Sequence, residues 1–152
     1  MLDEADARYP NETGGVIVGY RAKVDEYVVT AVSGPGPGAI HAARTFNPDH
    51  DFQVDWLARR YAASNQVETY LGDWHTHPNA TTAEPSWTDR RAAAAIADCP
   101  DARAAIPIMV IANGRAGDWR LHAWTFEARP VLAVFSLRRF VRGSVVDFIQ
   151  PS

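Results

Sequence analysis

Two histidines separated by one residue, followed at a short distance by an aspartate, are the side chains of this chain best placed to do chemistry. His75 and His77 lie at the end of an apolar segment typical of a β-strand, where side chains two residues apart share a face. Imidazole nitrogens bind Zn²⁺ at roughly 2.0–2.1 Å, so one strand can offer both rings to one ion. Asp89 follows in the first turn of the next predicted helix. Two imidazoles and a carboxylate leave one tetrahedral position open, as in a catalytic zinc site.

Each half of this pattern also has a purely structural interpretation. On their own, His75 and His77 could be hydrogen-bonded core residues. Ser86 and Asp89 form a capping box that lacks only the usual Glu, with Ser86 as the N-cap. The order of the parts favours a metal site, because a strand, His-x-His-Pro, a short loop and a helix opened by Ser-x-x-Asp follow one another. Capping and metal binding are compatible, since the Ser86 backbone can begin the helix while its hydroxyl faces the site.

The elements that must position these residues alternate between strands and helices. A strand over Val67–His77 ends at Pro78, and an alanine-rich helix runs from Ser86 to about Asp98. Other apolar, β-branched segments predict strands over Val16–Tyr20, Glu26–Val32, Pro107–Ala112, Asp118–Phe126 and, in the tail, Val131–Ile149. Helices are predicted over Leu2–Tyr9 and after Asn47-Pro48-Asp49, where apolar residues recur at Phe52, Trp56, Leu57 and Tyr61. We therefore expect an α/β fold with a mixed central sheet flanked by helices.

Two connections have the composition of loops. The Ser, Gly and Pro residues of positions 33–38 cannot form regular structure. The run Asn113–Gly117 predicts the turn of a β-hairpin. His41 and His50 lie in or near the first of these loops, and we expect both to face solvent.

Composition narrows the class of protein. With 152 residues, of which 47% are apolar and 22% charged, the chain suffices for one globular domain spanning residues 1–152. A net charge of −3 without a basic stripe argues against a nucleic acid or an anionic membrane as partner. The single cysteine, Cys99, excludes an intrachain disulfide and a structural zinc site of several thiolates. The acidic start is unlike a signal peptide and no apolar run reaches the length of a membrane span, so we expect a cytoplasmic protein.

Taken together, the motifs resemble the JAMM metalloenzymes, the MPN-domain family. The family's signature is a glutamate on an early strand, then His-Ser/Thr-His-Pro, then Ser-x-x-Asp, and this chain carries every position from Glu12 to Asp89. Two segments look particularly like the small prokaryotic JAB-domain members, namely Pro10-x-Glu12-Thr13-Gly14-Gly15-Val16-Ile17-Val18-Gly19 and Gly72-x-Trp74-His75-Thr76-His77-Pro78. The eight residues between His77 and Ser86 are one more than the family pattern has, and a bulge could absorb the addition.

The resemblance implies a fold and a role for each residue of the signature. The chain would form one JAB/MPN metalloprotease domain with three layers, related in shape to the cytidine deaminases. His75, His77 and Asp89 would bind Zn²⁺ as the cofactor. Glu12 would be the general base that takes a proton from the attacking water and passes it to the leaving amine. Ser86 would donate a hydrogen bond to the oxyanion of the tetrahedral intermediate.

The same resemblance implies a zinc metalloprotease or isopeptidase. Its substrate would be a ubiquitin-like protein or its conjugate, cleaved after the C-terminal glycine in deconjugation or precursor processing. One alternative is a zinc peptidase that acts on other peptides, such as cell-wall or phage-tail material. Another is a non-catalytic MPN-type scaffold, although such members usually lack some of the signature residues. A zinc measurement separates the scaffold from the zinc peptidases, since a scaffold should carry no stoichiometric metal.

Overall fold

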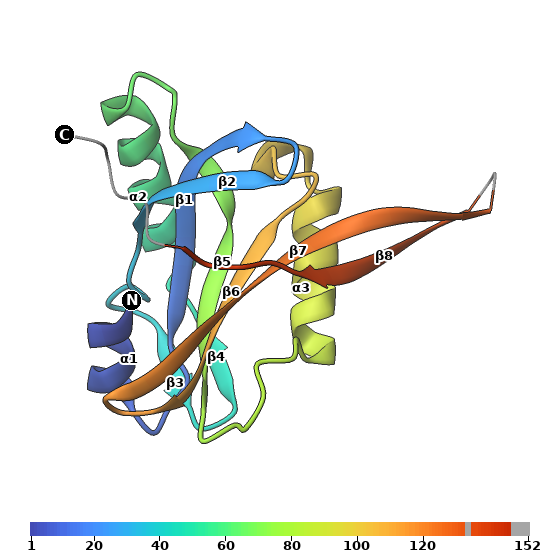
Figure 1. Cartoon of the computed structure of the whole chain (residues 1–152). Helices are drawn as coiled ribbons and strands as arrows, with labels where there is room; N and C mark the ends of the chain where they lie inside the picture. The colour runs from blue at the N-terminus through green and yellow to red at the C-terminus, as the bar shows by residue number, and fades with distance from the viewer. Residues whose placement is uncertain (133–134, 147–152) are drawn as a thin grey trace.

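The computed structural model describes residues 1–132 and 135–146 of the protein (Figure 1). Its helices are α1 (Leu2–Arg8), α2 (His50–Ala63) and α3 (Trp87–Asp98), followed by a 3₁₀ turn at Pro100–Ala102. Its strands are β1 (Gly14–Lys23), β2 (Glu26–Val32), β3 (Ile40–Ala42), β4 (Thr45–Asn47), β5 (Thr69–Pro78), β6 (Ile108–Arg115), β7 (Asp118–Leu132) and β8 (Phe135–Arg142). The strands β3 and β4 form a small hairpin, and the others form one central sheet.

The central sheet has the strand order β2-β1-β5-β6-β7-β8. Neighbouring strands are antiparallel except β5 and β6, which are parallel. A parallel pair requires a crossover connection, and the segment that carries α3 supplies it. This crossover starts at the end of β5, where the histidine motif lies, and the N-terminus of α3 lies close to that end. The predicted mixed sheet is confirmed.

Apolar side chains pack on both faces of this sheet, and alternate residues of β6 distinguish the two faces. Met109 and Ile111 belong to a buried cluster that α3 covers. Ile108 and Val110 belong to a second cluster, on which Met1 packs at the start of α1. Figure 1 shows α3 on one side of the strands and α1 and α2 on the other. The three-layer arrangement expected from the sequence is confirmed.

The helix α2 is anchored at its N-cap and by a buried polar contact. Asp49 caps the helix, because Oδ1 accepts a backbone N–H of the first turn at 3.1 Å. Its Oδ2 accepts the Gly38 N–H at 2.9 Å. Within the helix, the buried Gln53 accepts a hydrogen bond of 2.5 Å from the Ser33 hydroxyl. These bonds hold the Gly/Pro-rich loop between the sheet and α2.

The β6–β7 hairpin has a tighter turn than the sequence predicted. The strand β6 continues to Arg115, which pairs with Asp118, so the turn predicted over Asn113–Gly117 is wrong in its first half. Gly117 has a φ of 74°, in the left-handed region that glycine adopts at little cost. Glycine at this position allows a tight turn, so that the two strands stay paired up to Arg115 and Asp118.

Two further differences concern the ends and the connections of the sheet. The tail strand predicted over Val131–Ile149 overlaps the end of β7 and all of β8, while residues 133–134 and 147–149 of that range lie outside the described residues. No strand was predicted between the Gly/Pro loop and α2, where the structure has the β3–β4 hairpin. Strands of three residues are too short to show an alternating pattern, so only tertiary contacts define them.

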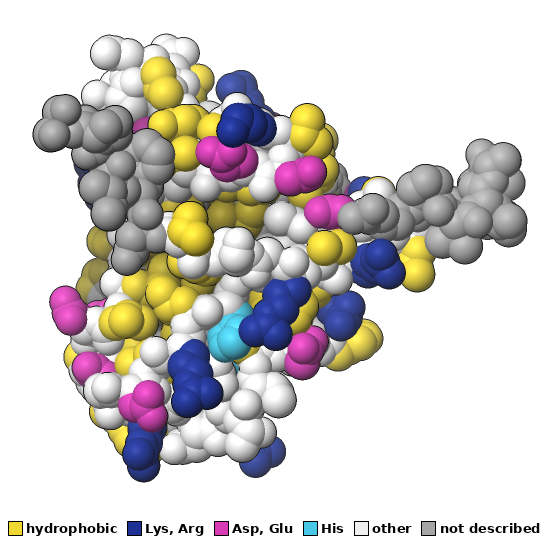
Figure 2. All heavy atoms as spheres, viewed as in Figure 1, with side chains coloured by type: hydrophobic (Ala, Val, Ile, Leu, Met, Phe, Trp, Pro, Cys, Tyr) yellow, Lys and Arg dark blue, Asp and Glu magenta, His cyan; other side chains and the backbone are white. Residues whose placement is uncertain are grey.

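The surface carries both signs of charge and one thiol. On the face drawn in Figure 2, basic and acidic side chains are interspersed. Cys99 is exposed at the C-cap of α3, at the helix end where it was predicted.

Among residues 1–132 and 135–146, no helix combines the length and the apolar character needed to cross a membrane.

Candidate metal centre

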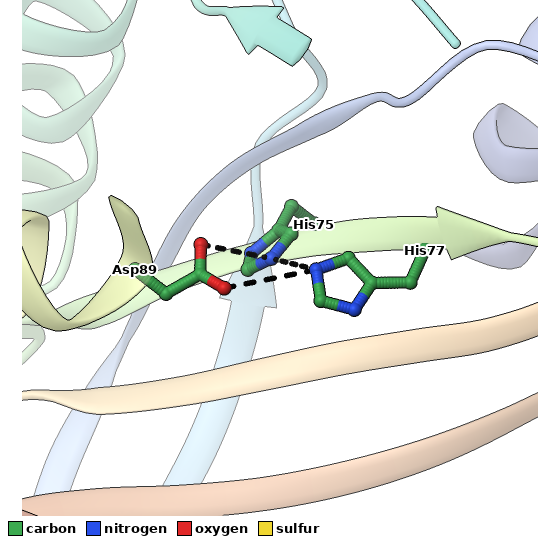
Figure 3. A group of neighbouring side chains, drawn as sticks. All are labelled: His75, His77 and Asp89. Atoms are coloured by element: carbon green, nitrogen blue, oxygen red, sulfur yellow. Dashed lines mark hydrogen bonds and ion pairs between the residues drawn. The ribbon is translucent and has the colours of Figure 1, made fainter. Parts of the chain in front are cut away.

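His75, His77 and Asp89 converge at one point, with the carboxylate of Asp89 facing both rings (Figure 3). One ligand atom from each residue lies within 4.8 Å of the other two. The Nε2 atoms of the histidines are 3.0 Å apart. Oδ1 of Asp89 lies 3.3 Å from Nε2 of His75, and Oδ2 lies 3.7 Å from Nε2 of His77. The side chains are 12%, 16% and 13% exposed, so the group is shielded but reachable from solvent.

The strand β5 presents both histidines on one face because it stays regular through the motif. Its parallel register with β6 is unbroken from Gly72, opposite Ile108, to Pro78, opposite Gly114. Thr76 lies between the histidines, points to the opposite face and is fully buried. Ordinary extended backbone therefore delivers two imidazoles to one side of the sheet without a special conformation.

Asp89 reaches the histidines from the first turn of α3, and a capping box holds that turn. The Ser86 hydroxyl accepts the Asp89 N–H at 3.2 Å, and the Ser86 N–H donates to Oδ2 of Asp89 at 2.6 Å. The carboxylate therefore caps the helix and faces both rings at the same time. The Ser86 hydroxyl accepts in this pair, so its own proton is left to donate elsewhere. The capping and the metal-binding interpretations are geometrically compatible.

The loop between β5 and α3 begins with a residue in the left-handed conformation. Asn79 has a φ of 60°, and its N–H donates to the Gly114 carbonyl at 2.6 Å. The Tyr9 hydroxyl donates to the Asn79 side chain at 2.7 Å. The β5–β6 register continues without a shift to Pro78, at the end of β5. The loop, one residue longer than the family pattern, still brings Asp89 to the histidines.

Glu12 enters the same recess from the segment that precedes β1. The β1–β5 register pairs Gly14 with His75, and its extension by two residues sets Glu12 opposite His77. Cross-strand neighbours point to the same face, so the Glu12 side chain shares the face of the histidines. Gly14 leaves room between them, because a Cβ there would lie 2.9 Å from the Phe46 ring and 3.0 Å from Cβ of His75.

Two buried threonines tie the Glu12 segment to the histidine strand. The Thr13 N–H donates to the Thr76 hydroxyl at 3.0 Å, and the Thr76 N–H donates to the Thr13 carbonyl at 2.8 Å. Both threonines are fully buried. The middle residue of His-Thr-His thus positions the neighbour of Glu12, a role that sequence reasoning missed. The alternation of His, Thr and His along one strand was the available signal, since it directs Thr76 away from the face of the two histidines.

The β3–β4 hairpin holds the main chain of Glu12 from the other side. The Glu12 N–H donates to the Ala42 carbonyl at 2.8 Å, and Nδ1 of His41 lies 2.9 Å from the Glu12 carbonyl oxygen. His41 is half-buried, so its predicted exposure to solvent is wrong, whereas His50 is exposed as predicted. The pairing of β3 with β4 turns His41 inward, which local sequence alone does not determine.

All five residues of the signature line one groove of about 790 Å³. Its walls also include Asp73, beside His75, and residues of the hairpin, namely Ile40, Arg44, Thr45, Phe46 and Asn47. Asp73 accepts a hydrogen bond of 2.8 Å from the Tyr70 hydroxyl, and burial raises the pKa of this carboxyl group. The groove has the volume of a typical ligand-binding cleft.

Burial and neighbouring charges set the protonation states in the groove. Burial lowers the pKa of His77 to about 4, with the charge of His75 adding to this effect and Asp89 opposing it. Burial by itself raises the pKa of Asp89, but bonds and charge from His75, with the Ser86 bonds, hold that pKa below its usual range. Burial raises the pKa of Glu12 to about 7, with His75 opposing and Asp89 adding. At neutral pH, His77 is therefore neutral and Asp89 ionised, as metal ligands must be.

The donor set fits a zinc ion. Two imidazole nitrogens and one carboxylate are common Zn²⁺ ligands, whereas Mg²⁺ and Ca²⁺ prefer oxygen. Three protein ligands match the number found in catalytic zinc sites, which keep a further position open. The ligand atoms lie within 4.8 Å of one another, close enough for a single ion between them. His75, His77 and Asp89 would hold that ion.

Comparison with known proteins adds an independent finding. A sequence model of the family described as prokaryotic homologs of the JAB domain matches residues 1–127. The probable metalloprotease y4qB of Sinorhizobium fredii is 42% identical over 124 residues, covering 82% of this chain and 76% of that protein. The CD-NTase/cGAS isopeptidase of Enterobacter hormaechei is 31% identical over 127 residues, covering 81% of this chain and 67% of that protein. Both relatives carry the names of hydrolases.

A solved structure supports the same architecture. The solution structure of protein DSY2949 from Desulfitobacterium hafniense matches with a TM-score of 0.60 and 21% identity. The match covers 91% of this chain and 82% of that one. At this level of identity, the likeness concerns the fold alone.

Proposed function

This chain belongs to the family of prokaryotic homologs of the JAB domain, and we propose that it is a zinc-dependent hydrolase of peptide or isopeptide bonds. The predicted resemblance to the JAMM metalloenzymes is thereby confirmed. The names of its relatives, a metalloprotease and an isopeptidase, support a hydrolase. The zinc ion, the role of each residue and the substrate are our proposal.

One observation carries the proposal: a complete hydrolytic set lines a single groove. Two imidazoles and a carboxylate converge within 4.8 Å, and Glu12 and Ser86 line the same groove. A scaffold has no need for a neutral histidine beside an ionised aspartate in a solvent-accessible recess. A hydrolase needs both, together with a group that can move protons.

Zn²⁺ held by His75, His77 and Asp89 would act as a Lewis acid and bring the pKa of a water molecule toward about 7. Glu12 then serves as the general base, accepting a proton from the attacking water on its carboxylate and delivering it to the leaving nitrogen. A carboxylate suits this work because it can accept a proton and release it again within one reaction cycle.

Ser86 stabilises the negative charge that develops on the carbonyl oxygen of the substrate. Its hydroxyl accepts the Asp89 N–H at 3.2 Å, which orients the hydroxyl and leaves the O–H to donate. A donor fixed in advance costs no reorganisation during the reaction, and removal of one such donor typically lowers turnover by about 10²–10³-fold.

We further propose a protein conjugate as the substrate class, cleaved after the C-terminal glycine of a ubiquitin-like protein. The resemblance to JAMM enzymes implies this class, and the relative named as an isopeptidase supports it.

The test combines metal analysis with turnover on one preparation. We expect about one zinc per chain after purification, as for a catalytic site with three protein ligands. A ubiquitin-like fusion and a Gly-Gly-linked fluorogenic peptide should both be cleaved, and a chelator should stop the cleavage. Protein without stoichiometric metal would identify a scaffold instead. Cleavage of unrelated peptides in preference to the Gly-Gly substrates would exclude the proposed substrate class and keep the peptidase.

A further inference from the structure

We propose that His41 is a positioning residue for Glu12, holding its main chain so that the carboxyl group stays in the groove. The inference rests on the general-base role proposed above for Glu12. It assigns a task to a histidine that lies outside the JAMM signature. It also explains why a two-stranded hairpin lies against the start of β1.

The main-chain groups of Glu12 are satisfied by this hairpin. Its N–H donates to the Ala42 carbonyl at 2.8 Å, and its carbonyl oxygen lies 2.9 Å from Nδ1 of His41. The sheet pairing of β1 with β5 begins only at Gly14. Glu12 therefore lies before the paired residues of the central sheet. The β3–β4 hairpin supplies the hydrogen-bond partners of its backbone N–H and carbonyl groups that are given above.

The hairpin contacts the body of the protein through two paired residues. His41 and Phe46 face each other in the β3–β4 register, with ring centroids 5.4 Å apart. Both are half-buried, whereas their neighbours in the hairpin, such as Ile40 at 67%, are exposed. The Phe46 ring approaches Gly14, so it sets the position of the His41 ring relative to β1. His41 is thus held from one side by packing and from the other by its hydrogen bond.

The chemistry of the acceptor determines the tautomer of His41. A carbonyl oxygen can only accept, so Nδ1 must carry the proton and donate it to Glu12. Loss of this donor removes the hydrogen bond from His41 to the Glu12 carbonyl oxygen. The segment before Thr13 is then held less firmly. Displacement of a catalytic group by about 1 Å can lower a rate on the order of 10²-fold. The effect should fall mainly on kcat, because Glu12 acts in the chemical step.

The first test examines the metal-free or zinc-loaded full chain by NMR, without a substrate. The ¹⁵N spectrum of His41 should show protonated Nδ1, and the Glu12 amide should exchange slowly with solvent. His41→Ala should accelerate Glu12 amide exchange by roughly 10-fold or more, because the hairpin loses its hold on this segment. His41→Asn places an amide N–H near the position of Nδ1 and should restore slow exchange. His50→Ala, a change at an exposed histidine, is the matched control and should leave exchange unchanged.

An Nδ1 without its proton, or exchange that is unaffected in His41→Ala, would overturn the proposal. These readouts do not depend on catalysis. They therefore stand even if the Gly-Gly-linked fluorogenic peptide proves a poor substrate.

The second test is a double-mutant cycle on turnover of that peptide. His41→Ala should lower kcat by about 10–10²-fold with KM nearly unchanged, and His41→Asn should recover most of the loss. In the Glu12→Gln background, His41→Ala should have less than about a twofold further effect, because a positioning residue acts only through its target. Equal losses in both backgrounds would assign His41 a general structural role and overturn the inference. An inactive Glu12→Gln with a fully active His41→Ala would overturn this inference alone. A fully active Glu12→Gln would overturn the proposed general base itself.

Discussion

The two sides of the groove are built in different ways. On one side, His75, His77 and Asp89 come from a central strand and from a capped helix that packs on the hydrophobic core. On the other side, Glu12 precedes the first paired residue of β1 and is bonded to a small, largely exposed hairpin. The side that carries His75, His77 and Asp89, the ligand side, thus forms together with the whole fold. The side that carries Glu12, the Glu12 side, depends on a few hydrogen bonds with the hairpin.

The two sides of the groove should respond differently to substitutions. Segments with few buried contacts open at a lower free energy than core strands and helices do. Substitutions on the ligand side should therefore change metal content and stability together. Substitutions on the Glu12 side should change turnover while the fold and the metal remain.

The largest effect is expected from loss of a ligand. Asp89→Ala removes a carboxylate and one half of the capping box. Zinc content should fall from about one ion per chain to near zero, because two imidazoles alone bind the ion far more weakly. Turnover should be abolished, and the free energy of unfolding should fall by about 1 kcal/mol through the lost cap. Metal analysis and thermal denaturation measure the two effects separately.

The matched variant Asp89→Asn distinguishes the two functions of this side chain. Asn keeps an oxygen that can accept the Ser86 N–H, but it lacks the charge, so zinc should be lost with a smaller drop in stability. His75→Ala should lose the metal as well. Full zinc occupancy in Asp89→Ala would show that Asp89 is only a helix cap, and the proposed coordination would be wrong.

Glu12→Gln tests the opposite side of the groove. Gln keeps the shape and the hydrogen-bonding reach but cannot accept the proton, so turnover should fall by about 10²–10⁴-fold. Zinc content should match that of the wild type, because Glu12 lies outside the ligand set. Loss of zinc in this variant would recast Glu12 as a ligand, and unchanged turnover would remove the general base from the mechanism.

The pH dependence of stability adds a second readout for Glu12 in the metal-free protein. Burial raises the pKa of Glu12 from 4.5 to about 7, so the folded state binds more protons than the unfolded state between these values. The contribution of Glu12 to stability should therefore be lost as the pH rises from about 4.5 to about 7. Glu12→Gln should not show this loss, and chemical denaturation of both proteins at several pH values measures it. Parallel curves for the two proteins would mean that the carboxyl group is not perturbed by burial.

A smaller effect is expected for Ser86→Ala, which affects both the cap and the oxyanion. Turnover should fall by about 10²–10³-fold with the metal retained, since an oxyanion donor acts only in the transition state. Ser86→Asn is the control, because Asn is also a good N-cap and should keep the stability without restoring the hydroxyl. A drop in melting temperature with little change in rate would leave Ser86 with the capping role alone.

The smallest effect on turnover is expected at the link between the two sides. Thr76→Val keeps the shape but leaves the buried Thr13 N–H without its acceptor. The free energy of unfolding should fall by about 1–3 kcal/mol, with zinc retained and turnover lowered only a few-fold. Denaturant unfolding gives the stability. A loss of zinc in this variant would show that the two sides are not independent.

Much of the ligand side was predictable, because its information is local in the sequence. The His-x-His spacing places two rings on one face of a strand, and Ser-x-x-Asp begins a helix in which the third position faces its cap. The strand over Glu26–Val32 was predicted with the boundaries that the structure has. The mixed sheet followed from the alternation of apolar segments along the chain.

The Glu12 side was predictable only through resemblance to a family. A glutamate before Thr-Gly-Gly has no local signal of catalysis, and burial that raises its pKa comes from residues far away in the chain. His41 looked like a loop residue, because the three-residue strands β3 and β4 are too short to show a pattern. The loop after Pro78 was predicted, but not the left-handed conformation of Asn79 or its bonds to Tyr9 and Gly114.

By itself, the sequence determined the residue types, their spacing and the periodicities that define strands and helices. These decided that His75 and His77 share a face and that Asp89 lies in the first turn of α3. The position of Glu12 opposite His77, and the contact of His41 with its main chain, arise only in the folded protein. The physical reason is that side-chain direction within one element follows from backbone geometry. The distance between elements depends on packing and hydrogen bonds that form only when the whole chain has folded.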